Sequence, residues 1–234
     1  MATFVPIAEN IWIVDGDNVN FHGFPYPTRS VVVRLQNGGL WIWSPIELSD
    51  RLRSEIQTIG QPAHLISPNK IHHLFLGDWH AAFPDAELWG PASTIRKRGD
   101  LQFQSPLIDE PPAAWVGQID QCWVRGSFVM DEIVFLHLPS RTAILADLSE
   151  NFSSIWLLEN WAPWQRSLAR LSKIVEGKGY APLDWRLSFI HRRKLREAKA
   201  KVLSWDPRKI IMAHGEWQSE NGREFLARAF EWIG

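Results

Sequence analysis

Five residues with metal-binding side chains lie where short apolar segments of the sequence end. They are four histidines and one aspartate: His72, His73, His137, Asp147 and His214. In layered α/β proteins, ligands usually bind at the carboxyl ends of strands and in the loops beyond them. Imidazole and carboxylate groups are the ligand types that hold zinc, manganese or non-haem iron. These positions therefore predict a metal site, provided that the fold brings the five side chains together.

Each of these residues also has a simpler interpretation. A single histidine at a strand end more often makes a hydrogen bond than binds a metal, and this applies to His137. Asp147 is placed to cap the helix-like run that follows it, and His214 precedes a glycine and fits a turn. The pair His72 and His73 favours a site more strongly, because the dipole at a helix start disfavours positively charged side chains.

The segment from 67 to 80, SPNKIHHLFLGDWH, contains three of the eight histidines of the chain. Asn69 is a good helix N-cap, and it directly follows a proline that ends the preceding strand. Ile71, Leu74 and Phe75 have the spacing of one buried helical face. The pattern therefore predicts a helix in which His72 and His73 occupy the first turn.

Apolar periodicity predicts the elements that would position the five residues. Strands are expected in the first third, with a hairpin at Asn37-Gly38-Gly39, and a second hairpin turns at Pro139-Ser140-Arg141. Residues 152–204 have a mainly helical pattern, and an amphipathic helix is expected from 223 to 233. This order of elements predicts sheets covered by helices, in a single α/β domain that spans residues 1–234.

Composition limits the classes of function. The 234 residues include 25 basic and 26 acidic side chains, for a formal net charge of −1, so binding to nucleic acid is not expected. No segment reaches the roughly 18 apolar residues needed to span a membrane, and the N-terminus does not resemble a secretory signal. Cys122 is the only cysteine, which excludes a disulfide framework and fits the reducing cytoplasm. We expect a cytoplasmic protein that acts on a small molecule.

The segment from 152 to 164 is unusually aromatic in a chain that has 14 tryptophans and two tyrosines. Its large apolar side chains are Phe152, Trp156, Leu157, Trp161 and Trp164. Such a segment either packs in the core or forms an exposed contact surface, here a pocket lid or the interface of a homo-oligomer.

Four strings of the sequence resemble the metallo-β-lactamase superfamily, and more narrowly its branch called the domain of unknown function 4336 family. The strings are GGLWIWSPIELS, PNKIHHLFLGDW, FLHLPSRTAILADL and WDPRKIIMAHG. The resemblance extends from about residue 5 to residue 233 and so covers nearly the whole chain. It implies a four-layer αββα sandwich with mixed sheets and a metal site at one edge of the two sheets.

The resemblance also implies a ligand set, but its first motif, H-x-H-x-D-H, is incomplete here. Only the last histidine is kept, as His73; His72 occupies the acidic position, and Pro68 and Lys70 replace the first two histidines. Two histidines are therefore missing, and a full dinuclear site is not expected.

Later positions of the superfamily pattern fall on His137, on Asp147 as the bridging aspartate, and on His214. Ser44 stands where the superfamily usually has a supporting aspartate. The resemblance thus implies a mononuclear site of His73, Asp147 and His214, helped by His72 or His137, or a site that has lost its metal.

These observations predict a metal-dependent hydrolase, because three ligands and an open position can activate water against an ester, amide or phosphoester. Zinc is the expected ion, with iron or manganese as alternatives. Asp147 would be a ligand or a base, and Asn69 would orient a ligand or polarise a substrate oxygen, unless it is only an N-cap. The alternatives are a non-catalytic binding or scaffold protein without a metal, and a redox-active iron protein.

Overall fold

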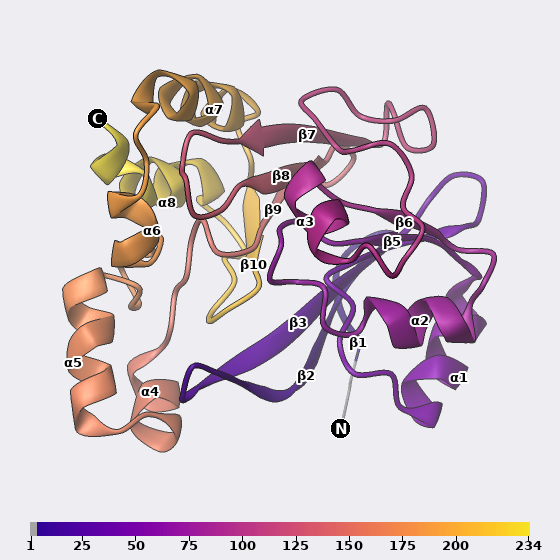
Figure 1. Cartoon of the computed structure of the whole chain (residues 1–234), viewed down its shortest axis with the longest axis horizontal. Helices are drawn as coiled ribbons and strands as arrows, with labels where there is room; N and C mark the ends of the chain where they lie inside the picture. The colour runs from indigo at the N-terminus through magenta and orange to yellow at the C-terminus, as the bar shows by residue number, and fades with distance from the viewer. Residues whose placement is uncertain (1–3) are drawn as a thin grey trace.

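Two mixed β-sheets form the centre of the molecule, whose computed structural model describes residues 4–234 (Figure 1). The first sheet has six strands in the order of the chain: β1 (Phe4–Ala8), β2 (Ile11–Phe21), β3 (Phe24–Arg34), β4 (Leu40–Trp43), β5 (Pro62–Ile66) and β6 (Glu87–Trp89). The second sheet has the order β10-β9-β8-β7, with β7 (Ile119–Val124), β8 (Glu132–His137), β9 (Thr142–Leu145) and β10 (Lys209–Met212). In each sheet, antiparallel pairs are combined with parallel ones.

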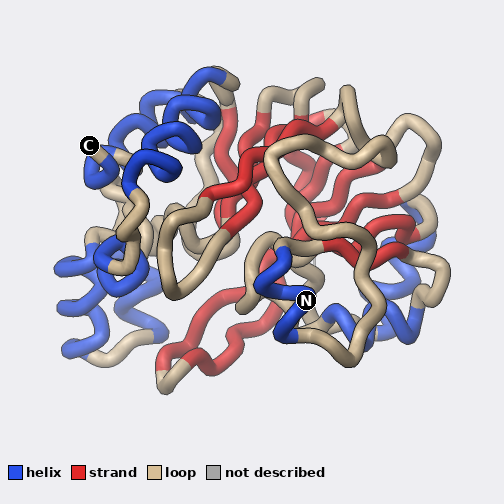
Figure 2. The backbone as a smooth tube through the Cα atoms, turned by 45° about the horizontal axis from the view of Figure 1, so that its top comes forward, coloured by secondary structure: helices blue, strands red, loops and turns tan. Residues whose placement is uncertain are grey.

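Helices cover the outer faces of both sheets, as Figure 2 shows. Helices α1 (Asp50–Ile59), α2 (Leu76–Ala82) and α3 (Ala92–Lys97) belong to the first half of the chain. The second half contributes α4 (Ser154–Asn160), α5 (Pro163–Ser172), α6 (Leu183–Leu187), α7 (Arg192–Ser204), α8 (Gly222–Ala229) and a short 3₁₀ helix, Glu231–Ile233. None of the helices within residues 4–234 is both long enough and apolar enough to cross a membrane.

Three apolar cores separate these layers. Large side chains of both sheets meet between them, among them Trp41, Phe135 and Ile211. The first sheet packs on its other face against α1 and α2, and the second sheet packs against α7 and α8. Burial on both faces explains why most strands are continuous apolar runs. The result is an αββα sandwich, which confirms the predicted fold class.

Local sequence signals explain most element boundaries. Gly38 has a positive φ of 85° and donates its amide to the carbonyl of Leu35 (2.8 Å), which closes the predicted hairpin between β3 and β4. The side chain of Ser49 caps α1 by accepting a hydrogen bond from the amide of Leu52 (3.2 Å). The turn at residues 139–141 likewise joins the antiparallel strands β8 and β9, so both hairpins are confirmed. The helices of the second half are confirmed too, although the terminal one ends at Ala229, before the 3₁₀ helix.

The helix predicted from residue 70 is wrong in its start, because residues 70–75 form turns and α2 follows them. Asn69 does act as a cap, since its Oδ1 accepts from the amides two and three residues on. However, the hydroxyl of Ser67 donates to the carbonyls of Asn69 (2.8 Å) and His72 (2.9 Å). In a regular helix these carbonyls would accept hydrogen bonds from backbone amides one turn further on. Leu74, predicted on the buried face, is 56% exposed.

The aromatic segment from 152 to 164 belongs partly to a core of its own. Phe152, Leu157 and Trp161 are buried together under the far end of the β2–β3 hairpin, which lies beside α4 in Figure 1. Ile155 and Trp164 are exposed. Core packing thus explains part of the segment, and an oligomer interface through the remainder stays a prediction.

Candidate metal centre

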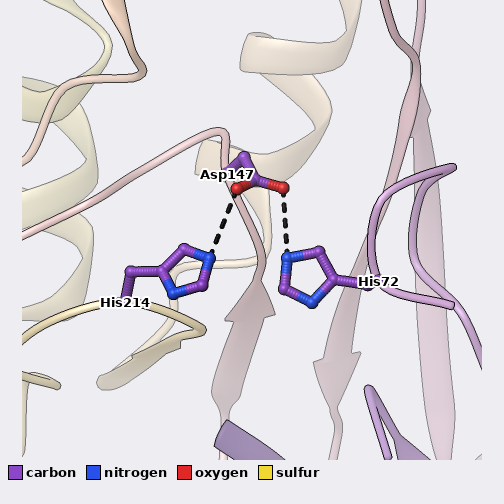
Figure 3. Close-up of side chains that lie close together, drawn as sticks. All are labelled: His72, Asp147 and His214. Carbon is purple, nitrogen blue, oxygen red and sulfur yellow. Dashed lines mark ion pairs between the residues drawn. The ribbon is translucent and has the colours of Figure 1, made fainter. Parts of the chain in front are cut away.

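His72, Asp147 and His214 meet at one edge of the sandwich (Figure 3). Each offers one ligand atom, and the three atoms lie within 4.8 Å of one another. The Oδ2 atom of Asp147 is 3.2 Å from Nε2 of His72, and its Oδ1 atom is 3.5 Å from Nε2 of His214. Asp147 and His214 are only 4% and 6% exposed. Three of the five predicted ligands therefore form one buried cluster.

The second sheet places Asp147 and His214 side by side. Strands β9 and β10 are parallel, and Leu145 pairs with Met212 as the last pair of the ladder. Asp147 and His214 each lie two residues beyond that pair, at the carboxyl ends of adjacent strands. His72 approaches them from the turns that follow β5 in the other sheet.

The hydrogen bonds of His214 fix its tautomer. Its Nδ1 is 2.8 Å from the carbonyl oxygen of Pro27, and because a carbonyl only accepts, this nitrogen carries the proton. Burial lowers the pKa of His214, although Asp147 opposes this, so the ring is neutral at pH 7. The Nε2 atom therefore presents a lone pair to a carboxylate oxygen of Asp147.

With Nε2 of His214 unprotonated, this atom and Oδ1 of Asp147 are two acceptors that face each other at 3.5 Å, and a proton or a metal ion between them relieves their repulsion. Burial raises the pKa of Asp147, but His72 and His214 lower it by more, so the carboxylate is ionised. A neutral imidazole, a carboxylate and a second imidazole are also a common ligand set of divalent cations. The donor set thus fits a metal ion.

Asn69 and Glu132 hold the carboxylate of Asp147 in place. The Nδ2 group of Asn69 donates to Oδ2 of Asp147 (2.7 Å) and to Oε2 of Glu132 (3.2 Å). Glu132 in turn accepts hydrogen bonds from the backbone amides of Ala146, Asp147 and Leu148. Asn69 is fully buried, so its amide orients Asp147 and does not reach a substrate.

Sequence reasoning missed Glu132, although a signal was present. It is the one charged residue buried within the apolar strand β8, and a buried carboxylate is costly unless donors surround it. Burial and the nearby charge of Asp147 raise the pKa of Glu132 to about 7, while the amides of Ala146 and Asp147 lower it.

Solved structures with a similar chain course are metallo-β-lactamases. The enzyme from Pontibacter korlensis superposes with a TM-score of 0.65 at 11% identity, over 100% of this chain and 99% of that one. The Erythrobacter litoralis enzyme with β-mercaptoethanol in its active site gives 0.66 at 13% identity, over 99% and 96%. For FIM-1 from Pseudomonas aeruginosa in its mono-zinc form, the TM-score is 0.58 at 12% identity, over 98% and 95%. The chain has the metallo-β-lactamase fold.

Sequence comparison adds no narrower assignment. No model of a known protein family matches the chain, and no curated protein is similar to it in sequence. The expected metallo-β-lactamase-like superfamily is confirmed at the level of the fold, and the narrower branch stays a prediction.

Within the metallo-β-lactamase fold of this chain, His73 does not join the cluster. Its carbonyl accepts a hydrogen bond from Arg98 (2.9 Å), and its ring lies against the same guanidinium. Burial, Lys97 and Arg98 lower the pKa of His73 to about 4. Residues 70–75 form turns, and the side chains of His72 and His73 lie in different surroundings. His72 is the one that reaches Asp147.

His137 lies at the opposite end of the second sheet. Strands β8 and β9 are antiparallel, so the end of β8 pairs with Thr142 at the start of β9, far from Asp147. The Nδ1 atom of His137 is 2.7 Å from the hydroxyl of Ser140, and burial lowers its pKa to about 4. The structure thus gives His137 the hydrogen-bonding role of its simpler interpretation.

Ser44 supports His72 where the metallo-β-lactamase superfamily usually has an aspartate. Its hydroxyl oxygen is 2.7 Å from Nδ1 of His72, and the ring of Trp43 stacks on the imidazole with centroids 6.0 Å apart. Ser44 adopts a left-handed conformation, with φ of 48°, directly after β4. This turn directs the hydroxyl toward the imidazole.

We expect Ser44→Ala to weaken binding of Zn²⁺ by about 10- to 100-fold, because the partners that orient a ligand are worth this much in other metal sites. The affinity can be measured by competition with a chromophoric chelator. Ser54→Ala, in a serine exposed on α1, is the matched control. An affinity that Ser44→Ala leaves unchanged would show that the imidazole needs no support from this hydroxyl.

Proposed function

We propose that the protein is a metal-dependent hydrolase with a mononuclear centre formed by His72, Asp147 and His214. The observation that carries this proposal is the convergence of the three ligand atoms within 4.8 Å, with Nε2 of His214 and Oδ1 of Asp147 facing each other at 3.5 Å. Zinc suits the set best, because two imidazoles and one carboxylate leave a fourth position open. Iron and manganese accept the same ligands.

The residues around the centre prepare it for hydrolysis. Ser44 and the carbonyl of Pro27 fix the two imidazole rings, and Asn69 fixes the carboxylate of Asp147. A divalent cation in this position supplies Lewis acidity, which polarises an ester or phosphoester and acidifies water. The ligands border a cavity of about 230 Å³, in which a substrate can reach them.

Metal loading and turnover test the proposal together. Chelator-treated protein is reconstituted with Zn²⁺, Mn²⁺ or Fe²⁺, and its metal content and its hydrolysis of p-nitrophenyl acetate and bis-p-nitrophenyl phosphate are measured. We expect one equivalent of metal and metal-dependent turnover of one substrate.

His214→Ala should abolish both properties while the circular dichroism spectrum is retained, whereas the control His191→Ala, in an exposed histidine before α7, should retain both. Failure to take up any of the three ions would reject the metal centre. Metal uptake without turnover would favour a binding or scaffold protein that keeps this fold.

A further inference from the structure

A second buried acid, Glu150, borders the cavity beside the metal centre. It is 1% exposed and follows Asp147 by three residues in the segment after β9. Its carboxyl group accepts a single hydrogen bond from the residues that the structure describes, from the hydroxyl of Tyr26 to Oε2, and this bond is long at 3.5 Å. The other oxygen, Oε1, accepts none from the described residues and is open to the cavity. Burial of a carboxyl group with so few partners is costly unless a ligand completes them.

The acids around Glu150 favour a positively charged partner, which is either a proton or a cationic ligand. Asp147 and Asp184 are its charged neighbours, and together with burial, the largest cause, they raise the pKa of Glu150 well above its usual value. Within residues 4–234, neither Glu150 nor Asp184 forms an ion pair with a basic side chain. Arg29, which borders the same cavity, is already paired with Asp15 (2.6 Å).

The other wall of the cavity is apolar. Phe21 at the tip of the β2–β3 hairpin, Leu74 and Val129 all border it and remain partly exposed there. Met130 and Trp185, which are buried, also line it. Exposed apolar groups that border a cavity commonly contact the apolar part of a ligand. The cavity therefore combines an apolar wall with a carboxyl group that lacks a positively charged partner.

We propose that the substrate is an amine carried on an apolar body, with its ammonium group bound by Glu150 and Asp184 and its apolar part against Phe21, Leu74 and Val129. This rests on the proposed function, because it names the substrate of that same centre. Glu150 is the buried, specificity-determining residue, and Asp184, which also borders the cavity, is exposed and adds a weaker attraction. On binding, the ammonium group displaces the proton that the raised pKa favours on Glu150; this proton leaves to solvent, and the carboxylate accepts a charge-assisted hydrogen bond, which is stronger than a neutral one.

Calorimetric binding of three probes of equal chain length tests the proposal: hexylamine, 1-hexanol and hexanoate. The metal-free protein is used, because a neutral amine would otherwise bind the metal directly. We expect hexylamine to bind at least about tenfold more tightly than 1-hexanol, as one charge-assisted hydrogen bond in a buried site provides. Hexanoate should bind most weakly, because its carboxylate is repelled by the acids of the cavity. Of the lysine and arginine side chains that line the cavity, Lys70 alone is not paired with an acid.

Glu150→Gln keeps the shape of the side chain and removes its charge, so it should abolish the preference for the amine and leave the affinity for 1-hexanol unchanged. Glu220→Gln changes the net charge equally at an exposed position and should retain the preference. Asp184→Asn, at an exposed residue, should reduce the preference by a factor of about two to three, as expected for a surface charge.

Equal binding of amine and alcohol, tighter binding of hexanoate, or an amine preference that survives both Glu150→Gln and Asp184→Asn would overturn the proposal. If Glu150→Gln does not fold, a preference for the amine that Asp184→Asn leaves unchanged would also overturn the proposal. Because the probes bind the metal-free protein, this result is independent of metal uptake, which tests the proposed function by itself.

Discussion

Asp147→Asn should lower the affinity for Zn²⁺ by more than about 100-fold, since even residues that only support a ligand are worth 10- to 100-fold. The same change should leave the free energy of unfolding of the metal-free protein within about 1 kcal/mol of its original value, the size of one ordinary hydrogen bond. The reason is the pair of acceptors at 3.5 Å. An asparagine at 147 can donate its amide to Nε2 of His214 and still accept from Asn69 and His72 through its oxygen.

Competition with a chromophoric chelator measures the first effect, and urea unfolding of chelator-treated protein measures the second. Asp85→Asn, at an exposed residue outside the cavity, is the control for the lost charge. The contrary result is informative: if the His214 ring carried a proton on both nitrogens, and so one positive charge, Asp147→Asn would leave a buried cation without its partner and cost roughly 3–5 kcal/mol. A loss of that size would refute the neutral imidazole from which the metal centre is inferred.

Gly215→Ala should be the most destabilising small substitution near the centre. Gly215 follows His214 with a φ of +92°, and a Cβ atom there would lie 2.2 Å from the carbonyl oxygen of Asn151. That oxygen accepts the amide of Glu216 (2.8 Å), and the amide of Asn151 donates to the carbonyl of His214 (3.1 Å), so neither segment can yield alone. We expect a loss of about 2–5 kcal/mol, the sum of left-handed strain and overpacking.

Gly23→Ala is a matched control for this substitution. Gly23 has a similar φ of +86°, but no atom lies within 4 Å of the position where its Cβ would be. The control should therefore cost only the conformational strain, about 1–2 kcal/mol. Urea unfolding of the metal-free variants measures both losses. If the two variants lost equal free energy of unfolding, the backbone near Asn151 would have to move away from the new Cβ atom at no energetic cost.

The sequence was sufficient to predict which strand-end residues meet where the two strands pair in parallel. Asp147 and His214 each follow a short apolar run, and because β9 and β10 are parallel, both residues arrive at the same edge. The same rule does not apply to His137, because Pro139-Ser140-Arg141 reverses the chain and β8 runs against β9. A hairpin turn between two candidate strand ends was therefore enough to separate His137 from Asp147.

The choice between His72 and His73 could not be made from sequence periodicity. Both residues fit the first turn of a helix, but the chain forms turns there, and the hydroxyl of Ser67 contacts two of their backbone carbonyls. A hydrogen bond from a side chain to the backbone of its own loop has no periodic signature. Burial of Glu132 and Glu150 was equally hidden, because it depends on donors and neighbours from distant parts of the chain.

Parallel pairing between β9 and β10 also constrains how this centre can change in evolution. The spacing between Asp147 and His214 is set by a ladder of four residue pairs, so it cannot alter unless all four pairs slip together. His72 is carried instead by turns, whose length and course can vary while both sheets stay intact. Related chains could therefore acquire or lose a ligand on the His72 side through a short insertion or deletion, and retain an invariant half-centre in the second sheet.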